Sequence, residues 1–168
     1  LLKTRGNISQ DGRPTFNMTA AELLDITTSL SKQIEVIPAH IWTPWWSLFG
    51  SVSGFNLVEE CYQDKADEVH ALETGLSSDP PMNWRLSRLD KYLLVSNSDS
   101  HSPLPHRLGR EANVFELTEL SYSEVISALR RSGRSRLKYT IETYPQYGKY
   151  HWTGHRMCNV SMSPQEAL

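Results

Sequence analysis

The sequence predicts an α/β fold built on a parallel sheet or barrel, and three observations support this prediction. Helix-type and strand-type patterns alternate along much of the chain, which is the order found in parallel α/β proteins. The strand-type runs are short and almost continuously apolar, as in strands that are covered on both faces. Each run is followed by a side chain of a metal-binding type, and parallel strands gather their functional sites at one edge.

The first elements are a helix and a buried strand. Thr19 and Glu22 form a capping-box pattern before an apolar run, which predicts a helix over residues 20–32. Residues 34–39 (IEVIPA) are typical of a buried strand, and His40 follows them directly. The next segment, HIWTPWWSLFGSVSGF, has no regular period and is rich in Gly, Ser and Trp, so we expect a long loop with a functional role.

Two further helix–strand pairs follow this loop. A helix is expected over residues 57–67 and a strand over residues 69–73, which ends on Glu73. A second helix over residues 82–90 leads to the strand YLLVS at residues 92–96. The order is therefore helix, strand, helix, strand, helix, strand.

The C-terminal part of the pattern is less regular. NVFELTEL predicts a strand over residues 113–120, and Ser121 caps a short helix that ends at Gly133. Alternation in SRLKYTIETYP predicts a final strand over residues 135–145. We expect three regions: the barrel part at residues 1–120, a helix–strand connection at 121–148 and a small module at 149–168.

Donor side chains after three successive strands predict one metal site. Asp99 and His101 are two positions apart after the third strand, so both point the same way if the backbone stays extended. The alternative is that Asp99 only begins a turn and that His101 is solvated. With His40 and Glu73 at the ends of the two earlier strands, we favour a shared site. Mixed oxygen and nitrogen donors suit zinc, manganese or iron better than calcium.

Aromatic and basic residues predict contacts with nucleic acid. The loop after His40 carries Trp42, Trp45 and Trp46, which either stack on bases or pack the loop itself. A basic stretch at residues 130–138 could contact phosphates. For Arg130 and Arg131 the alternative is a solvated helix end, where positive charge interacts favourably with the helix dipole. The stretch comprises Arg130, Arg131, Arg134, Arg136 and Lys138.

The two cysteines carry different expectations. Cys158 stands three residues after His155, which is half of a structural zinc site, and such a site needs four ligands. The alternative is a buried cysteine near a surface histidine. Cys61 lies in a helical segment and is expected in the core.

The composition excludes several classes of protein. The chain has 168 residues, of which 39% are hydrophobic, so one domain with a core is expected. No apolar run is long enough to cross a bilayer, and we expect no membrane partner. Two cysteines are too few for a disulfide scaffold, which favours a cytoplasmic location. A net charge of -2 excludes attraction of the whole chain to polyanions, but not a local basic face.

Several stretches resemble one known family. From residue 34 on, IPAHIWTPWWSLFG, ALETGLSSDPPMNWRLSRLDKYLLVSNSDSHS, LGREANVFEL and YGKYHWTGHRMC are similar to endonuclease Q, a branch of the PHP (polymerase and histidinol phosphatase) metallohydrolases. The resemblance implies a distorted (β/α)7 barrel with clustered divalent metals (Zn, Mn or Mg) at the strand ends. His40, Glu73, Asp99 and His101 match the later metal-ligand motifs, with catalytic roles for Asp99 and His101. The family pattern also implies a zinc module that begins with His155 and Cys158.

The chain departs from the family pattern in one respect. The His-x-His motif of the family's first strand does not occur anywhere in the sequence. We therefore expect the chain to be an internal piece of a longer protein, with the later part of the barrel and the start of the zinc module, and to be inactive alone.

The resemblance implies an endonuclease that cuts DNA 5′ to deaminated bases such as uracil, hypoxanthine or xanthine. The expected partner is damaged duplex or single-stranded DNA. Clustered metals suit phosphodiester hydrolysis because they activate water and neutralise the developing charge. Two alternatives remain open: a phosphoesterase of the histidinol-phosphatase kind that acts on a small substrate, and a zinc-containing nucleic-acid-binding module without catalysis.

Overall fold

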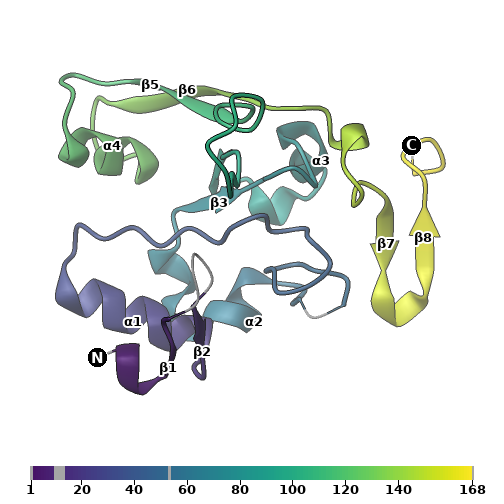
Figure 1. Cartoon of the computed structure of the whole chain (residues 1–168), viewed down its shortest axis with the longest axis horizontal. Helices are drawn as coiled ribbons and strands as arrows, with labels where there is room; N and C mark the ends of the chain where they lie inside the picture. The colour runs from purple at the N-terminus through teal and green to yellow at the C-terminus, as the bar shows by residue number, and fades with distance from the viewer. Residues whose placement is uncertain (1, 10–13, 53, 168) are drawn as a thin grey trace.

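The computed structural model describes residues 2–9, 14–52 and 54–167, except for the side chain of Arg156. These residues form a mixed α/β structure with four two-stranded sheets, of which one is parallel and three are antiparallel (Figure 1). The sequence predicted only the later part of a barrel, and the described residues form no closed barrel.

The N-terminal part confirms the predicted capped helix. It contains η1 (Leu2–Thr4), the antiparallel pair β1 (Gly6–Asn7) and β2 (Thr15–Phe16), and α1 (Ala20–Leu30). The Thr19 hydroxyl accepts a hydrogen bond from the Glu22 backbone N–H, while the Glu22 carboxylate accepts from the Thr19 backbone N–H at 2.8 Å. This reciprocal pair satisfies two donors that a helix start would otherwise leave open.

The parallel pair β3 (Ala71–Glu73) and β4 (Leu93–Val95) forms the centre of the fold, with Glu73 in register with Val95. A short helix and a 3₁₀ turn precede each strand, as the pattern predicts. These elements are α2 (Val58–Tyr62) and η2 (Gln63–Glu68) before β3, and α3 (Pro80–Trp84) and η3 (Ser87–Leu89) before β4.

The strand predicted over residues 34–39 is wrong, because this segment forms no ladder with another strand. It runs beside β3 through two hydrogen bonds, from Glu73 N to Pro38 O and from Ile41 N to Glu73 O. A parallel ladder joins one residue to partners two positions apart, whereas these partners are three apart. The extra residue is accommodated at His40, whose φ of 34° lies in the left-handed region.

The C-terminal strands are antiparallel, which corrects the expectation of a purely parallel sheet. β5 (Ala112–Glu116) pairs with β6 (Arg136–Ile141), and α4 (Tyr122–Leu129) connects them and lies along one side of the pair (Figure 1). The chain continues through η4 (Pro145–Tyr147), β7 (Thr153–His155), η5 (Arg156–Cys158) and β8 (Val160–Met162). The hairpin β7–β8 was not predicted, and it extends away from the rest of the molecule in Figure 1. The domain boundaries at residues 120 and 148 stay predictions.

Apolar side chains on the two faces of the parallel pair bury two clusters. Leu72 packs on one face with Leu24 of α1 and Val58 of α2. Ala71 and Val95 pack on the other face with Ile126 and Leu129 of α4. Because side chains alternate along a strand, neighbouring residues of β3 serve opposite faces. This sandwich holds the C-terminal ends of β3 and β4 in place.

Among the described residues, none of the helices is both long and apolar enough to cross a membrane.

Candidate active site

A buried carboxylate lies at the C-terminal end of β3. Glu73 is 6% exposed, and its two oxygens accept hydrogen bonds from different segments. The backbone N–H of His40 donates to Oε2 at 2.6 Å, and Nδ2 of Asn97 donates to Oε1 at 2.8 Å. A carboxylate oxygen has more than one lone pair, so each of these oxygens keeps an acceptor position. Glu73 therefore links the loop that begins at His40 to the loop that follows β4.

His40 is held close to this carboxylate. Its Nδ1 is buried and has no hydrogen-bond partner among the described residues. A side chain at Gly75 would place Cβ 2.9 Å from the His40 Cβ, and the φ of Gly75 is +63°. Glycine is therefore required at position 75 for two reasons, conformation and space. The buried Nδ1 of His40 is therefore a metal-type donor without a partner, on a residue whose backbone N–H binds the Glu73 carboxylate.

Asp99 and His101 form a second pair on the loop after β4. Asp99 has a φ of 45°, so the backbone is not extended as the sequence argument assumed. The His101 Nδ1 lies 2.9 Å from the Asp99 backbone oxygen and 3.7 Å from Oδ1 of the same residue. Both side chains are about half exposed, at 51% for Asp99 and 46% for His101.

The four predicted ligands thus form two pairs and not one cluster. Within residues 2–9, 14–52 and 54–167, no three His, Cys, Asp or Glu side chains converge as metal ligands would. The metal set of His40, Glu73, Asp99 and His101 stays a prediction. Asn97, which links the two loops through Glu73, was missed because an asparagine in a polar loop is an ordinary turn residue.

The tryptophans of the loop after His40 have different environments. The Trp42 ring lies 4.8 Å from that of Phe49, and its Nε1 donates to Asn83 Oδ1 at 2.8 Å. This geometry favours the packing alternative for Trp42. Trp45 is 43% exposed and meets the Tyr150 ring edge-on at 5.6 Å, while Trp46 is 91% exposed. Trp45 and Trp46 are therefore the two that a base could reach.

The basic stretch is largely engaged within the protein. Nε of Arg130 lies 2.7 Å from Oε2 of Glu35, whose side chain is only 5% exposed. Glu116 accepts from both Arg136, at 2.7 Å, and Lys138, at 3.2 Å. Arg130 is the C-cap of α4, as the helix-end alternative has it, but its guanidinium is held by a carboxylate remote in sequence and not left to solvent.

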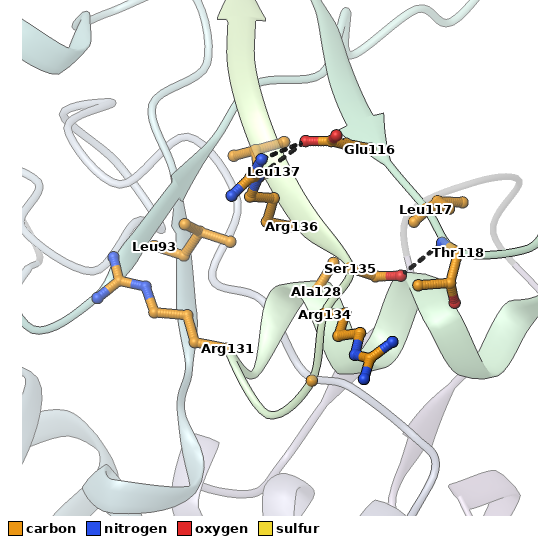
Figure 2. Close-up of a pocket in the computed structure, with 11 residues that line it drawn as sticks. Leu93, Glu116, Leu117, Thr118, Ala128, Arg131, Arg134, Ser135, Arg136 and Leu137 are labelled. Atoms are coloured by element: carbon orange, nitrogen blue, oxygen red, sulfur yellow. Dashed lines mark hydrogen bonds and ion pairs between the residues drawn. The ribbon is translucent and has the colours of Figure 1, made fainter.

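Arg131 and Arg134 line a pocket of about 730 Å³ between β5, β6 and the end of α4. In Figure 2, Arg136 turns towards Glu116, whereas the guanidinium groups of Arg131 and Arg134 point away from each other. Nη2 of Arg131 donates to the backbone carbonyl oxygen of Tyr92 at 3.3 Å. Arg134 makes no hydrogen bond or ion pair within the part of the chain that the structure describes. The DNA-binding role of the stretch stays a prediction, and Arg134 is its most available member.

The predicted zinc residues lie on the C-terminal hairpin. His155 ends β7, and Cys158 is an exposed free thiol in the turn before β8. The two residues are near each other in the chain, but no third donor joins them among the described residues. Cys158 is not the buried cysteine of the alternative. Cys61 is partly buried and packs against the core, and burial raises its pKa to about 11, as expected for a structural thiol.

A second buried carboxylate, with a half-buried one near it, lies beside the candidate site. Glu111 is 3% exposed and accepts hydrogen bonds from the Ser96 hydroxyl and, at 2.7 Å, from the Thr143 backbone N–H. The neighbouring Glu142 is half-buried, and its Oε2 has no partner among the described residues. Burial, together with the nearby charge of Glu111, raises the pKa of Glu142 to about 7.

This shift predicts a dependence of stability on pH. The folded protein keeps the Glu142 proton up to about pH 7, whereas the unfolded chain releases it near pH 4.5. Stability is therefore lost as pH rises between these values. We expect Glu142→Gln to be more stable than the parent by about 1 to 2 kcal/mol at pH 8, a value reduced for solvent screening, and by almost nothing at pH 4.5.

Thermal melts at pH 4.5 and pH 8 measure this difference. The matched control is Glu119→Gln, which changes an exposed carboxylate and is expected to show no pH-dependent gain. A gain for Glu142→Gln that is equal at both pH values would contradict the assignment.

Comparisons with known proteins support one family. No family model matches the chain. The crystal structure of the lesion-specific endonuclease PfuEndoQ from Pyrococcus furiosus is similar over 99% of this chain, with 34% identity and a TM-score of 0.81. A crystal structure of endonuclease Q with a 27-mer duplex substrate that has an abasic lesion at the active site matches equally well.

Two curated sequences are also similar. The uncharacterised protein MJ0043 from Methanocaldococcus jannaschii is 34% identical over 133 residues, and YqxK from Bacillus subtilis is 29% identical over 148 residues. The chain spans 16% and 37% of these two proteins and 40% of each endonuclease Q chain. The resemblance to endonuclease Q predicted from the sequence is confirmed.

Proposed function

From this endonuclease Q-like fold, we propose that the full-length protein is an endonuclease that cuts damaged DNA. The observation that carries the proposal is the match to PfuEndoQ over 99% of the chain at 34% identity. Such a level of identity with the same fold supports a shared chemistry, whereas fold alone does not. The proposed substrate is a duplex with a deaminated base or an abasic site, cut on the 5′ side of the lesion.

The proposed chemistry is hydrolysis of a phosphodiester at the end of β3 and β4. A divalent metal, when bound, would activate water and neutralise charge on the phosphorus. We propose His40, Glu73, Asp99 and His101 as residues that hold it, and the buried unpartnered Nδ1 of His40 supports this. The fit is partial, because the described residues supply two pairs of donors and no convergent set of three. Zinc at His155 and Cys158 is proposed on the family resemblance alone.

The first test is a nicking assay on the full-length protein with Mn²⁺ or Mg²⁺. The substrate is an end-labelled duplex that carries one uracil, hypoxanthine or abasic site, and the control is the same duplex without a lesion. We expect a single cut 5′ to the lesion and none in the control. Hydrolysis of a small phosphate ester without any nicking would favour the phosphatase alternative and contradict the proposal.

Trp46 is the proposed stacking residue for a base at the lesion. Its side chain is 91% exposed, and stacking of one base on an aromatic ring contributes about 1 to 3 kcal/mol. We expect Trp46→Ala to weaken binding of lesion-containing duplex by about 5- to 150-fold. Fluorescence anisotropy with a labelled duplex measures the change.

The matched control is Trp84→Ala, which removes another exposed tryptophan, at the end of α3. It is expected to leave affinity within about 2-fold of the parent. Equal losses for the two variants would show that Trp46 has no special role in lesion recognition.

A further inference from the structure

Three residues at the start of β5 hold the loop that carries Asp99 and His101. Gly109, with a φ of +70°, turns the chain towards β5. The next residues send their side chains back to the end of β4, about fifteen positions earlier in the sequence. The residues are Arg110, Glu111 and Asn113. We call this set the β5 latch.

Asn113 binds the backbone of Ser96 as a neighbouring strand would. Its Oδ1 accepts from the Ser96 N–H at 2.9 Å, and its Nδ2 donates to the Ser96 oxygen at 2.8 Å. The same Nδ2 donates to Oδ1 of Asn97 at 3.0 Å. Asn97 in turn donates to Glu73, so one chain of hydrogen bonds joins the latch to the buried carboxylate.

Arg110 and Glu111 fix the residues on either side of Asn97. Nε and Nη2 of Arg110 both donate to the backbone carbonyl oxygen of Ser98, at 3.1 and 2.8 Å, and Ser98 directly precedes Asp99. Glu111 and Asn113 are two positions apart and both bind Ser96, as side chains on one face of an extended chain do. The carboxylate of Glu111 accepts from the hydroxyl of Ser96, which is fully buried.

We infer that Arg110, Glu111 and Asn113 are positioning residues for Asp99 and His101. The inference rests on the proposed nuclease function, since it concerns the same site. Asp99 and His101 are half exposed and lie on a loop with a left-handed residue, so the loop depends on outside contacts for a single conformation. A displacement of reacting groups by about 1 Å is enough to lower a catalytic rate about 100-fold. In functional sites generally, supporting hydrogen bonds of this kind orient the functional side chains without contacting the substrate.

The test uses Arg110→Ala and Asn113→Asp in the full-length protein. The second variant keeps the shape of asparagine but removes both N–H donors of its Nδ2. The control is Arg107→Ala, which removes an exposed arginine in the same loop that makes no side-chain hydrogen bond in the described part of the chain. We measure kcat and KM on lesion-containing duplex, the melting temperature, and hydrogen exchange of the amides at residues 97–102.

For the two latch variants we expect kcat to fall about 10- to 100-fold while KM stays within about 2-fold. Hydrogen exchange is expected to rise at residues 97–102 and not in β3 or α4. Added guanidinium is expected to restore part of the activity of Arg110→Ala and none of Asn113→Asp. The control is expected to match the parent in every measurement.

Two results would overturn the inference: unchanged exchange at residues 97–102 in both variants, or a loss of kcat accompanied by faster exchange throughout the protein. If the parent protein does not cut lesion-containing DNA, the proposed function fails by itself. The exchange data then still decide whether the latch holds the loop, so the two failures are distinguishable.

Discussion

Replacing Asp99 with asparagine in the full-length protein is expected to lower the rate of DNA cleavage by about 100- to 10,000-fold. Asparagine has nearly the shape of aspartate, but it lacks the negative charge and one of the two acceptor oxygens. The proposed role of Asp99 in holding a metal needs that charge. The side chain is 51% exposed and belongs to neither apolar cluster of the described residues, so the fold is expected to be unaffected.

Single-turnover nicking measures the rate, and a binding titration at several salt concentrations measures DNA affinity. Affinity and its dependence on salt are expected to remain within about 2-fold of the parent, since we expect phosphate contacts to come from cations and not from Asp99. The control is Asp64→Asn, an exposed aspartate in η2 that is expected to cleave at the parent rate. A normal rate for Asp99→Asn would remove Asp99 from the site.

The sequence correctly predicted the elements whose structure follows from a pattern of residues close together in the chain. The capping box of α1 is closed by two residues that are three positions apart, so the pattern contains its whole mechanism. β3 and β4 are apolar because helices cover both faces, and this too can be read from their composition. The position of Glu73 at the end of β3 was predicted from the same apolar run, which stops at this residue.

Elements that depend on distant partners could not be predicted in this way. Residues 34–39 have the composition of a strand, but the left-handed residue at His40 prevents a regular ladder with β3. The pairing of β5 with β6 across α4 is antiparallel, and alternation in each strand does not reveal the partner. The β5 latch joins polar side chains to a backbone about fifteen residues away, and no local pattern marks such contacts.

The basic stretch shows the same limit most clearly. A run of five cations is typical of a nucleic-acid surface, yet the charge of a side chain does not tell which carboxylate lies opposite. Arg130 faces the buried Glu35, while Arg136 and Lys138 share the exposed Glu116. These two acidic residues therefore allow a direct comparison of a buried and an exposed ion pair.

Glu35→Ala is expected to destabilise the protein by about 2 to 4 kcal/mol. Glu35 accepts from Arg130 Nε at 2.7 Å and contacts His70 Nδ1 at 2.8 Å, so its removal leaves two partly buried groups without their partner. Arg130 also donates to the Ile34 oxygen at 3.1 Å, and this contact joins the segment at 34–39 to the end of α4. Loss of the carboxylate is therefore expected to loosen the segment that carries His40.

Thermal melts and hydrogen exchange of the full-length protein measure this effect, and Glu116→Ala is the control. The Glu116 side chain is 54% exposed, and exposed ion pairs contribute only about 0 to 1 kcal/mol even with two cationic partners. Faster exchange at residues 34–41 is expected for Glu35→Ala alone. Equal destabilisation by the two variants would mean that burial does not distinguish the pairs, and Arg130 would then be as available to DNA as Arg136. The expected inequality instead assigns Arg130 to the fold, which leaves Arg134 as the member of the stretch best able to contact a phosphate.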